Sequence, residues 1–113
     1  MGEVDNKYID LASGLPRVAN NEALYKKLLA KFETSVDIAG FDAALAAGDV
    51  TRASEIVHAA KGIAGNLSLM AFYDNSAALM DRIRDGSAPS QEDADTFKRI
   101  YGETVQAIKD YLA

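Results

Sequence analysis

The chain has 113 residues and a single histidine, which is its best candidate for nucleophilic chemistry. His58 opens the stretch "HAAKGIAG", where Lys61 follows one helical turn later and Gly62 and Gly65 come next. A neutral imidazole nitrogen is a competent nucleophile, and a lysine one turn away can pair with developing negative charge. Each glycine costs a helix roughly 1 kcal/mol relative to alanine, so two glycines beside this histidine need a physical reason.

A helical wheel places His58 on the outside of the helix that carries it. At about 100° per residue, one group of apolar residues gathers within about 120° and forms the expected core stripe. This stripe consists of Ala53, Ile56, Val57, Ala60, Ile63, Ala64 and Leu67. His58 lies roughly 160° from the centre of the stripe, and we therefore expect it to face solvent.

The residues around His58 on the wheel are candidates for binding a partner protein. They are Thr51, Ser54, Gly62 and Gly65 on the same side, with Lys61 on one flank and Glu55 on the other. Because glycine lacks a Cβ atom, we expect the two glycines to leave a shallow strip where a partner approaches the imidazole closely. Three further candidates for this docking surface are Asn66, Ile38 and Phe41. The sequence leaves open whether the last two belong to the surface or to the core.

The elements that must position these residues are predicted to be helices. Alanine is abundant and β-branched residues are sparse, which favours helix over strand. The pattern predicts a short helix ending near Gly14, then long helices over 22–47, 50–68, 71–85 and 91–112. Expected apolar positions are Leu24, Leu28, Phe32, Ala39, Ala43 and Ala46 in the first long helix, and Ala94, Phe97, Ile100, Tyr101, Thr104, Ile108, Tyr111 and Leu112 in the last. Ile38, Phe41 and Leu45 lie on a different side of the first long helix, so this helix either kinks near Gly40 or has two apolar faces.

The short connections between these helices imply antiparallel neighbours. We therefore expect an all-α fold, an up-down antiparallel four-helix bundle with an additional short N-terminal helix. The length suits one domain, residues 1–113. The expected caps are Asn20 or Asn21, Asp49 and Ser90.

The composition argues against several classes of partner. A net charge of −5 disfavours nucleic acid and anionic membranes, which both need clustered Lys and Arg. No apolar run approaches the roughly 18 residues of a membrane span, and no signal-peptide pattern opens the chain, so we expect a cytoplasmic protein without membrane insertion. We expect neither a cofactor nor a metal, because the sequence has no P-loop, no cysteine and only one histidine.

Read as "HAAKGIAGNLS", residues 58–68 resemble the signature of the histidine phosphotransfer (HPt) domain, approximately H-x-L-K-G-x-[AS]-x-x-[LI]-G. The matching positions are His58, Lys61, Gly62, Ala64 and Leu67. Two positions depart from it: Ala60 stands where leucine is usual, and Ser68 where glycine is usual. The segments "NNEALYKKLLAKF" and "LAAGDVTRASEIVHAAKG" also resemble the family, so the similarity extends from about Ile9 to Gly86. The last helix matches only in pattern.

The resemblance implies a role for the histidine. His58 would accept a phosphoryl group from a receiver-domain aspartate or a kinase and pass it to a response-regulator aspartate, with Lys61 supporting the phosphoryl oxygens. The partners would be a receiver domain and a cognate (hybrid) histidine kinase. In the family the receiver supplies the metal and the acidic pocket, so this chain would be a monomeric phosphocarrier without its own ATP site and not an autonomous enzyme.

Two other classes of function compete with this one. A hydrolase that uses His58 as a general base needs a nucleophile and orienting groups converging in a pocket, and Ser54 with Glu55 would form at most an open arrangement. A helical adaptor without chemistry would dock a partner through the face formed by His58, Gly62 and Gly65. Incubation with a phosphorylated receiver distinguishes the phosphocarrier from these alternatives, because only the phosphocarrier becomes labelled on histidine.

Overall fold

The computed structural model describes residues 8–83 and 86–113, and all regular structure in these ranges is helical. The elements are α1 (Leu11–Gly14), the 3-10 helix η1 (Leu15–Val18), α2 (Glu22–Ala30), α3 (Phe32–Ser35), α4 (Ile38–Ala46), α5 (Val50–Leu67), α6 (Met70–Ile83) and α7 (Gln91–Leu112). The predicted all-α class is confirmed. Parts of two expected segments, residues 6–7 and 84–85, lie outside the described residues.

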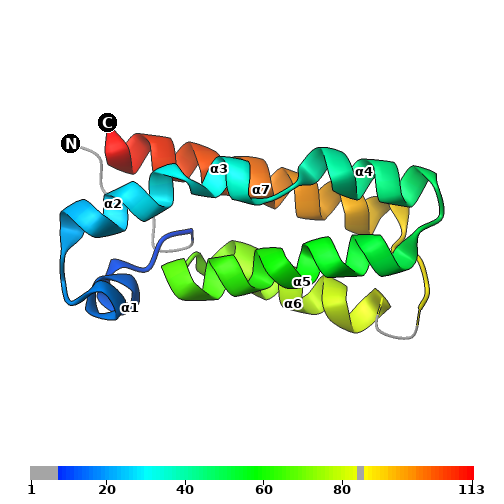
Figure 1. Ribbon diagram of the computed structural model, residues 1–113, viewed down its shortest axis with the longest axis horizontal. Helices are drawn as coiled ribbons and strands as arrows, with labels where there is room; N and C mark the ends of the chain where they lie inside the picture. Colours follow the sequence, from blue (N-terminus) through cyan, green and yellow to red (C-terminus); the bar gives the residue numbers. More distant parts are fainter. Residues whose placement is uncertain (1–7, 84–85) are drawn as a thin grey trace.

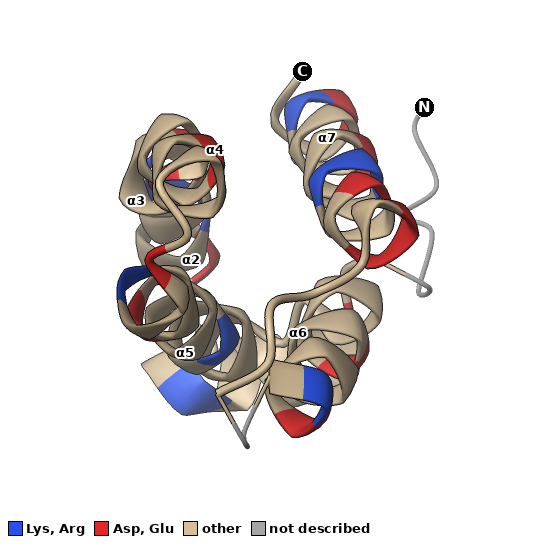
Figure 2. Ribbon diagram, turned by 90° about the vertical axis from the view of Figure 1, so that its right-hand side faces the viewer, with Lys and Arg blue, Asp and Glu red and all other residues tan. Residues whose placement is uncertain are grey.

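The chain reverses direction after α4, after α5 and after α6 (Figure 1). α2, α3 and α4 follow one another along one side of the molecule, and α5 returns beneath them. α6 then runs beside α5, and α7 returns against α6 (Figure 1). In the end-on view of Figure 2, α4 stands above α5 and α7 above α6. Within the described ranges, no helix is both long enough and apolar enough to cross a membrane.

Three of the helices begin at the capping residues that the sequence predicts. The side chains of Asn21, Asp49 and Ser90 each accept a hydrogen bond of 3.0 Å from the backbone N–H three residues later. These bonds satisfy N–H groups that have no partner within the helix. The caps therefore fix where α2, α5 and α7 begin.

The helix expected over 22–47, either kinked near Gly40 or with two apolar faces, is broken into α2, α3 and α4, and the break before α4 lies close to the expected kink. Val36 is extended, with φ −104° and ψ 119°, and Asp37 then caps α4 by accepting a hydrogen bond of 2.8 Å from the Gly40 N–H. Each break changes the rotational phase of the helix, so a wheel drawn through all 26 positions assigns the wrong face. The buried residues are Tyr25, Leu29, Phe32, Val36, Phe41 and Ala44, of which Phe32 was expected, while Leu24, Ala39, Ala43 and Ala46 are exposed.

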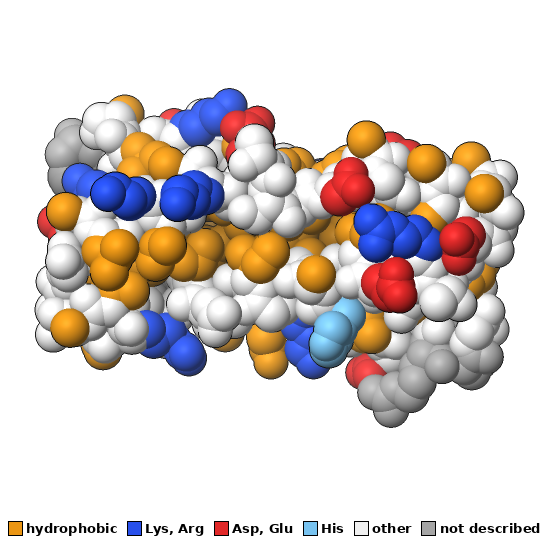
Figure 3. All heavy atoms as spheres, viewed as in Figure 1, with side chains coloured by type: hydrophobic (Ala, Val, Ile, Leu, Met, Phe, Trp, Pro, Cys, Tyr) orange, Lys and Arg blue, Asp and Glu red, His pale blue; other side chains and the backbone are white. Residues whose placement is uncertain are grey.

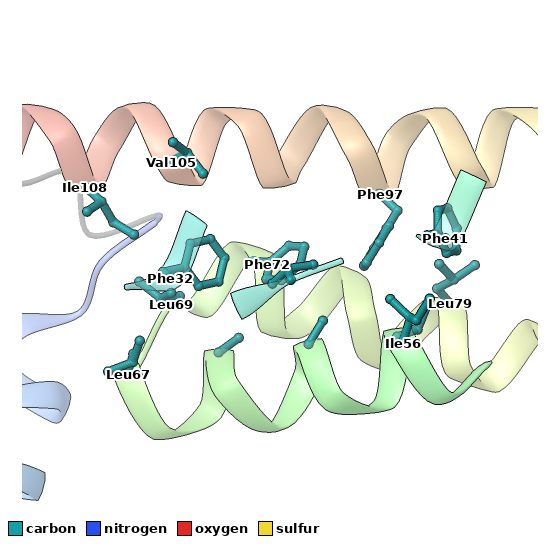
Figure 4. Packing of buried hydrophobic residues seen from close by; sticks show 14 of the residues in the cluster. Phe32, Phe41, Ile56, Leu67, Leu69, Phe72, Leu79, Phe97, Val105 and Ile108 are labelled. Carbon is teal, nitrogen blue, oxygen red and sulfur yellow. The ribbon is translucent and has the colours of Figure 1, made fainter. Parts of the chain in front are cut away.

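Aromatic rings from four helices form the centre of the core (Figure 4). The Phe72 ring of α6 lies 5.5 Å from Phe32 and 5.2 Å from Phe97 between ring centroids. Phe41 of α4 lies 4.9 Å from Phe97 of α7 and is fully buried. Complete burial of such a side chain contributes about 1.5–3 kcal/mol. Of the two possibilities that the sequence leaves open for the docking candidate Phe41, the structure shows the core, because this ring joins α4 to α7.

The predicted core stripes of the other two long helices are largely confirmed. In α5, Ile63 is half-buried and the other stripe residues are buried. In α7, the buried positions are Ala94, Phe97, Thr104, Val105 and Ile108, of which only Val105 was not expected. The buried stripe of α5 turns its opposite side, with the histidine, to solvent.

The N-terminal segment is bound to the end of α5. The Tyr25 hydroxyl donates a hydrogen bond to the Leu67 carbonyl oxygen, and the Asp10 N–H donates one of 3.0 Å to the Ser68 carbonyl oxygen. The Ser68 hydroxyl donates to the Ser13 hydroxyl at 3.0 Å. Burial, and to a smaller extent the Asp10 carboxylate, raises the pKa of Tyr25 to about 12. These contacts hold the last turn of α5 in place.

Candidate functional site

His58 lies in the middle of α5 and is exposed, as the wheel predicts. Figure 3 shows the pale blue imidazole on the surface of the molecule. Among the described residues, none hydrogen-bonds to the ring or forms an ion pair with it. A Ser–His–Asp arrangement needs the imidazole between a nucleophile and an orienting carboxylate, and no described residue makes either contact. The ring instead lies exposed on the surface of α5.

An open groove of about 650 Å³ runs beside His58. Its described lining residues are Gly48, Asp49, Val50, Thr51, Ser54, Glu55, His58, Met80, Ile83 and Gly86. The groove thus brings three predicted docking residues, Thr51, Ser54 and Glu55, together with the histidine. Met80 and Ile83 of α6 were not anticipated, because periodicity within one helix does not tell which neighbouring helix borders a surface.

A small charged cluster borders this groove on the α4 side. The Arg52 guanidinium lies 3.7 Å from the Asp37 carboxylate and 3.5 Å from the Glu55 carboxylate. All three side chains are more than half exposed, so each pair contributes at most about 1 kcal/mol. The ion pair with Arg52 engages the Glu55 carboxylate, the acidic group nearest to His58 in the sequence of α5.

Lys61 follows His58 by one turn and leans towards α6. Its ammonium nitrogen lies 5.7 Å from the centroid of the Tyr73 ring, and the side chain is half-buried. Such a cation–π contact contributes about 0.5–1 kcal/mol. The contact holds the positive charge beside the histidine face, and no carboxylate of the described residues forms an ion pair with it. Lys61 therefore retains a charge that can face an anion.

The two glycines of the predicted strip have different surroundings. A Cβ atom built on Gly62 meets no atom within 4 Å, so the surface there is open, as predicted. A Cβ atom on Gly65 would lie 3.2 Å from Cε1 of Tyr73, which is tighter than an ordinary contact. The prediction that Gly65 leaves room for a partner is wrong, because the Tyr73 ring of α6 occupies that space.

The remaining docking candidates lie away from the His58 groove. Asn66 is exposed and borders a second groove at the other end of α5. Ile38 is half-buried and packs against the core cluster, and Phe41 lies within that cluster. The open surface around the histidine is therefore formed by the first three turns of α5, the end of α6 and Gly62.

Ser68 explains one departure from the HPt signature. It ends α5 in the left-handed conformation, with φ 56° and ψ 43°, which glycine adopts without strain. The serine is held in this conformation by its hydrogen bond to Ser13 and by burial of its side chain. The turn after the helix thus has the geometry that a glycine would favour.

Comparison of the chain with protein-family models, curated proteins and solved structures gave no match. The functional argument therefore depends on the residues of the site. In the part of the chain that the structure describes, no group of three or more His, Cys, Asp or Glu side chains is placed to hold a metal ion.

Proposed function

We propose that this chain is a phosphocarrier of the HPt type, in which His58 accepts a phosphoryl group from an aspartyl phosphate of a receiver domain, or from a kinase. His58 then passes the group to an aspartate of a response regulator. The observation that carries the proposal is an exposed imidazole in the middle of α5 that contacts no polar group of the described residues, with open backbone surface at Gly62 one turn away. A second protein can bring its own reactive group to such a histidine.

The transfer step balances without a further reactant. A neutral ring nitrogen attacks phosphorus, a nitrogen–phosphorus bond forms, and the bond from phosphorus to the aspartyl oxygen breaks. The donor aspartate leaves as a carboxylate, and the same steps in reverse load the acceptor aspartate. The Lys61 ammonium contacts the Tyr73 ring and pairs with no carboxylate of the described residues, so it can turn to the phosphoryl oxygens and stabilise their charge.

The proposed function includes a finer description of the fold. The column α2–α4 and the helices α5, α6 and α7 would form an up-down antiparallel four-helix bundle, with α1 and η1 as the additional N-terminal helix. The three chain reversals support this arrangement. The carrier would act as a cytoplasmic monomer that meets a receiver domain and a cognate histidine kinase in turn.

The test is phosphotransfer from a panel of phosphorylated receiver domains. We expect an acid-labile, alkali-stable label on the wild-type chain, and we expect His58→Gln to abolish it. Because His58 is exposed, its replacement should change the free energy of unfolding by no more than about 0.5 kcal/mol. Matching circular dichroism and melting curves provide the control.

Two outcomes contradict the proposal. Undiminished labelling of His58→Gln would remove the histidine from the chemistry. Receiver binding without any label on the wild-type chain would favour the adaptor, which docks a partner and transfers nothing.

A further inference from the structure

A second groove, of about 600 Å³, lies where η1, α2, α3 and α5 meet, away from the His58 groove. Its volume falls within the roughly 300–1,000 Å³ that is usual for the binding sites of small molecules. A stable protein–protein interface takes about 20–30 residues from each partner, whereas nine described residues line this groove. The size of the second groove therefore fits a small ligand.

The residues beneath and beside the opening of the second groove are apolar. Phe32 and Leu67 are buried and form its floor, while Val18, Leu28 and Ile63 are half-buried and form its walls. Covering such surface with an apolar group removes it from water, which favours binding. The floor and the walls thus fit the alkyl chain of a ligand.

The charged and amide groups of the second groove are hydrogen-bond donors whose side chains are free to bind. Arg17, Lys31 and Asn66 line the groove and are exposed, and none of these side chains forms a hydrogen bond or an ion pair with a described residue. The Ser35 hydroxyl instead donates a hydrogen bond of 2.7 Å to the Lys31 carbonyl oxygen. None of the described lining residues is Asp or Glu.

The basic residues form a rim around apolar surface. Figure 3 shows basic side chains above and below the apolar surface in the left-hand part of the molecule. A guanidinium and an ammonium group only donate hydrogen bonds, and they bind most strongly to an acceptor that carries negative charge. The rim therefore fits the polar end of a ligand that is a carboxylate.

We propose that the second groove binds a free fatty acid, with the alkyl chain on the apolar floor and the carboxylate on the rim formed by Arg17 and Lys31. A net charge of −5 disfavours the alternative in which the same residues contact an anionic membrane. The proposal does not depend on the phosphocarrier function, because His58 does not line this groove.

The alkyl chain is tested by titrating octanoate, decanoate and dodecanoate, each below its critical micelle concentration, into the isotope-labelled wild-type chain. We expect saturable shifts of the amide signals at Val18, Leu28 and Ile63. Burial of one methylene group strengthens binding by up to about fourfold. In an open groove, each added methylene should therefore raise the affinity about two- to fourfold.

The carboxylate is tested by comparing decanoate with uncharged decanol in the variant Arg17→Gln/Lys31→Gln. We expect this variant to bind decanoate about fivefold more weakly than the wild-type chain, and to bind decanol equally well, because only the acid loses its ionic partners. Lys109→Gln removes a positive charge from the exposed face of α7 and is the matched control, with unchanged affinity for decanoate. His58→Gln should also bind decanoate as the wild-type chain does, so a failure of phosphate transfer leaves this result unaffected.

Each part of the proposal can be contradicted separately. Equal affinities for the three acids, or shifts confined to residues outside the second groove, would overturn it on the wild-type chain alone. Undiminished binding of decanoate to Arg17→Gln/Lys31→Gln, with the melting curve of a folded protein, would overturn the placement of the carboxylate. Binding to phosphatidylglycerol vesicles without binding of the free acids would assign the groove to a membrane surface, and a concentration-dependent dimer that the double variant abolishes would assign it to a second copy of this chain. Either result would overturn the proposal.

Discussion

Gly62 and Gly65 stand three residues apart on the same side of α5, yet the space above them differs. Above Gly62 there is solvent, whereas above Gly65 there is the ring of Tyr73 from the next helix. Both positions give up helix propensity, but for different physical reasons. Gly62 leaves room above the helix for a binding partner, and Gly65 lets α5 and α6 pack closely. The comparison teaches that a glycine in a helix marks a close approach without saying from which molecule.

The largest expected difference comes from placing glutamine at each position. Gly65→Gln should lower the free energy of unfolding by about 1–3 kcal/mol, because its side chain must displace the Tyr73 ring. Gly62→Gln should raise it by up to about 1 kcal/mol through better helix propensity. Denaturant titration of the two variants measures both changes.

The same pair of variants tests what the open glycine is for. Gly62→Gln should transfer phosphate poorly despite its intact fold, because a long side chain fills the surface beside His58. Loss of stability in Gly62→Gln would mean that the position serves internal packing. Normal stability and normal transfer would mean that receiver docking does not use it.

Alanine substitutions at Gly62 and Gly65 should give a smaller difference in the free energy of unfolding. Gly62→Ala should stabilise the chain by up to about 1 kcal/mol, and Gly65→Ala by clearly less, since its Cβ atom crowds Tyr73 at 3.2 Å. In a Tyr73→Ala background the crowding disappears, so both alanines should then stabilise equally. A double-mutant cycle of melting free energies checks this, and an unchanged difference would rule out the ring as its cause.

Replacement of Lys61 is expected to have the smallest effect on phosphate transfer. Lys61 lies next to Gly62, and its ammonium group packs on the Tyr73 ring that covers Gly65. Lys61→Ala should slow transfer to His58 about two- to fivefold without abolishing it, as expected for an exposed supporting charge. Single-turnover transfer at saturating receiver is the measurement. A wild-type rate would show that the Lys61 ammonium is solvated and packs on Tyr73 without contributing to transfer.

Those parts of the molecule that depend on nearby residues could be predicted from the sequence. The caps at Asn21, Asp49 and Ser90 act on the next turn, and the buried stripe of α5 repeats within one uninterrupted helix. The exposure of His58 follows directly from that stripe.

What depends on contacts between distant segments could not be predicted. Phe41 is buried because Phe97 of α7 lies against it, and Gly65 is covered because α6 brings Tyr73 over it. The break at Val36 and Asp37 lies close to the kink expected near Gly40, but a helical wheel cannot locate it, because the wheel assumes a constant rotation per residue. The groove lined by Val18, Leu28 and Leu67 could not be predicted for the same reason, since η1, α2, α3 and α5 all contribute to it.

The hydrogen bonds that bind Asp10, Ser13 and Tyr25 to the last turn of α5 also determine how the molecule opens. Segments that share buried contacts separate as a cooperative unit, so the N-terminal segment and the end of α5 should loosen together, ahead of the aromatic core. Val18 of the N-terminal segment and Leu67 at the end of α5 both line the groove that lies between η1, α2, α3 and α5. Partial unfolding would therefore remove this groove while the helix around His58 remains folded. A molecule bound in the groove would in turn stabilise this part of the chain against unfolding.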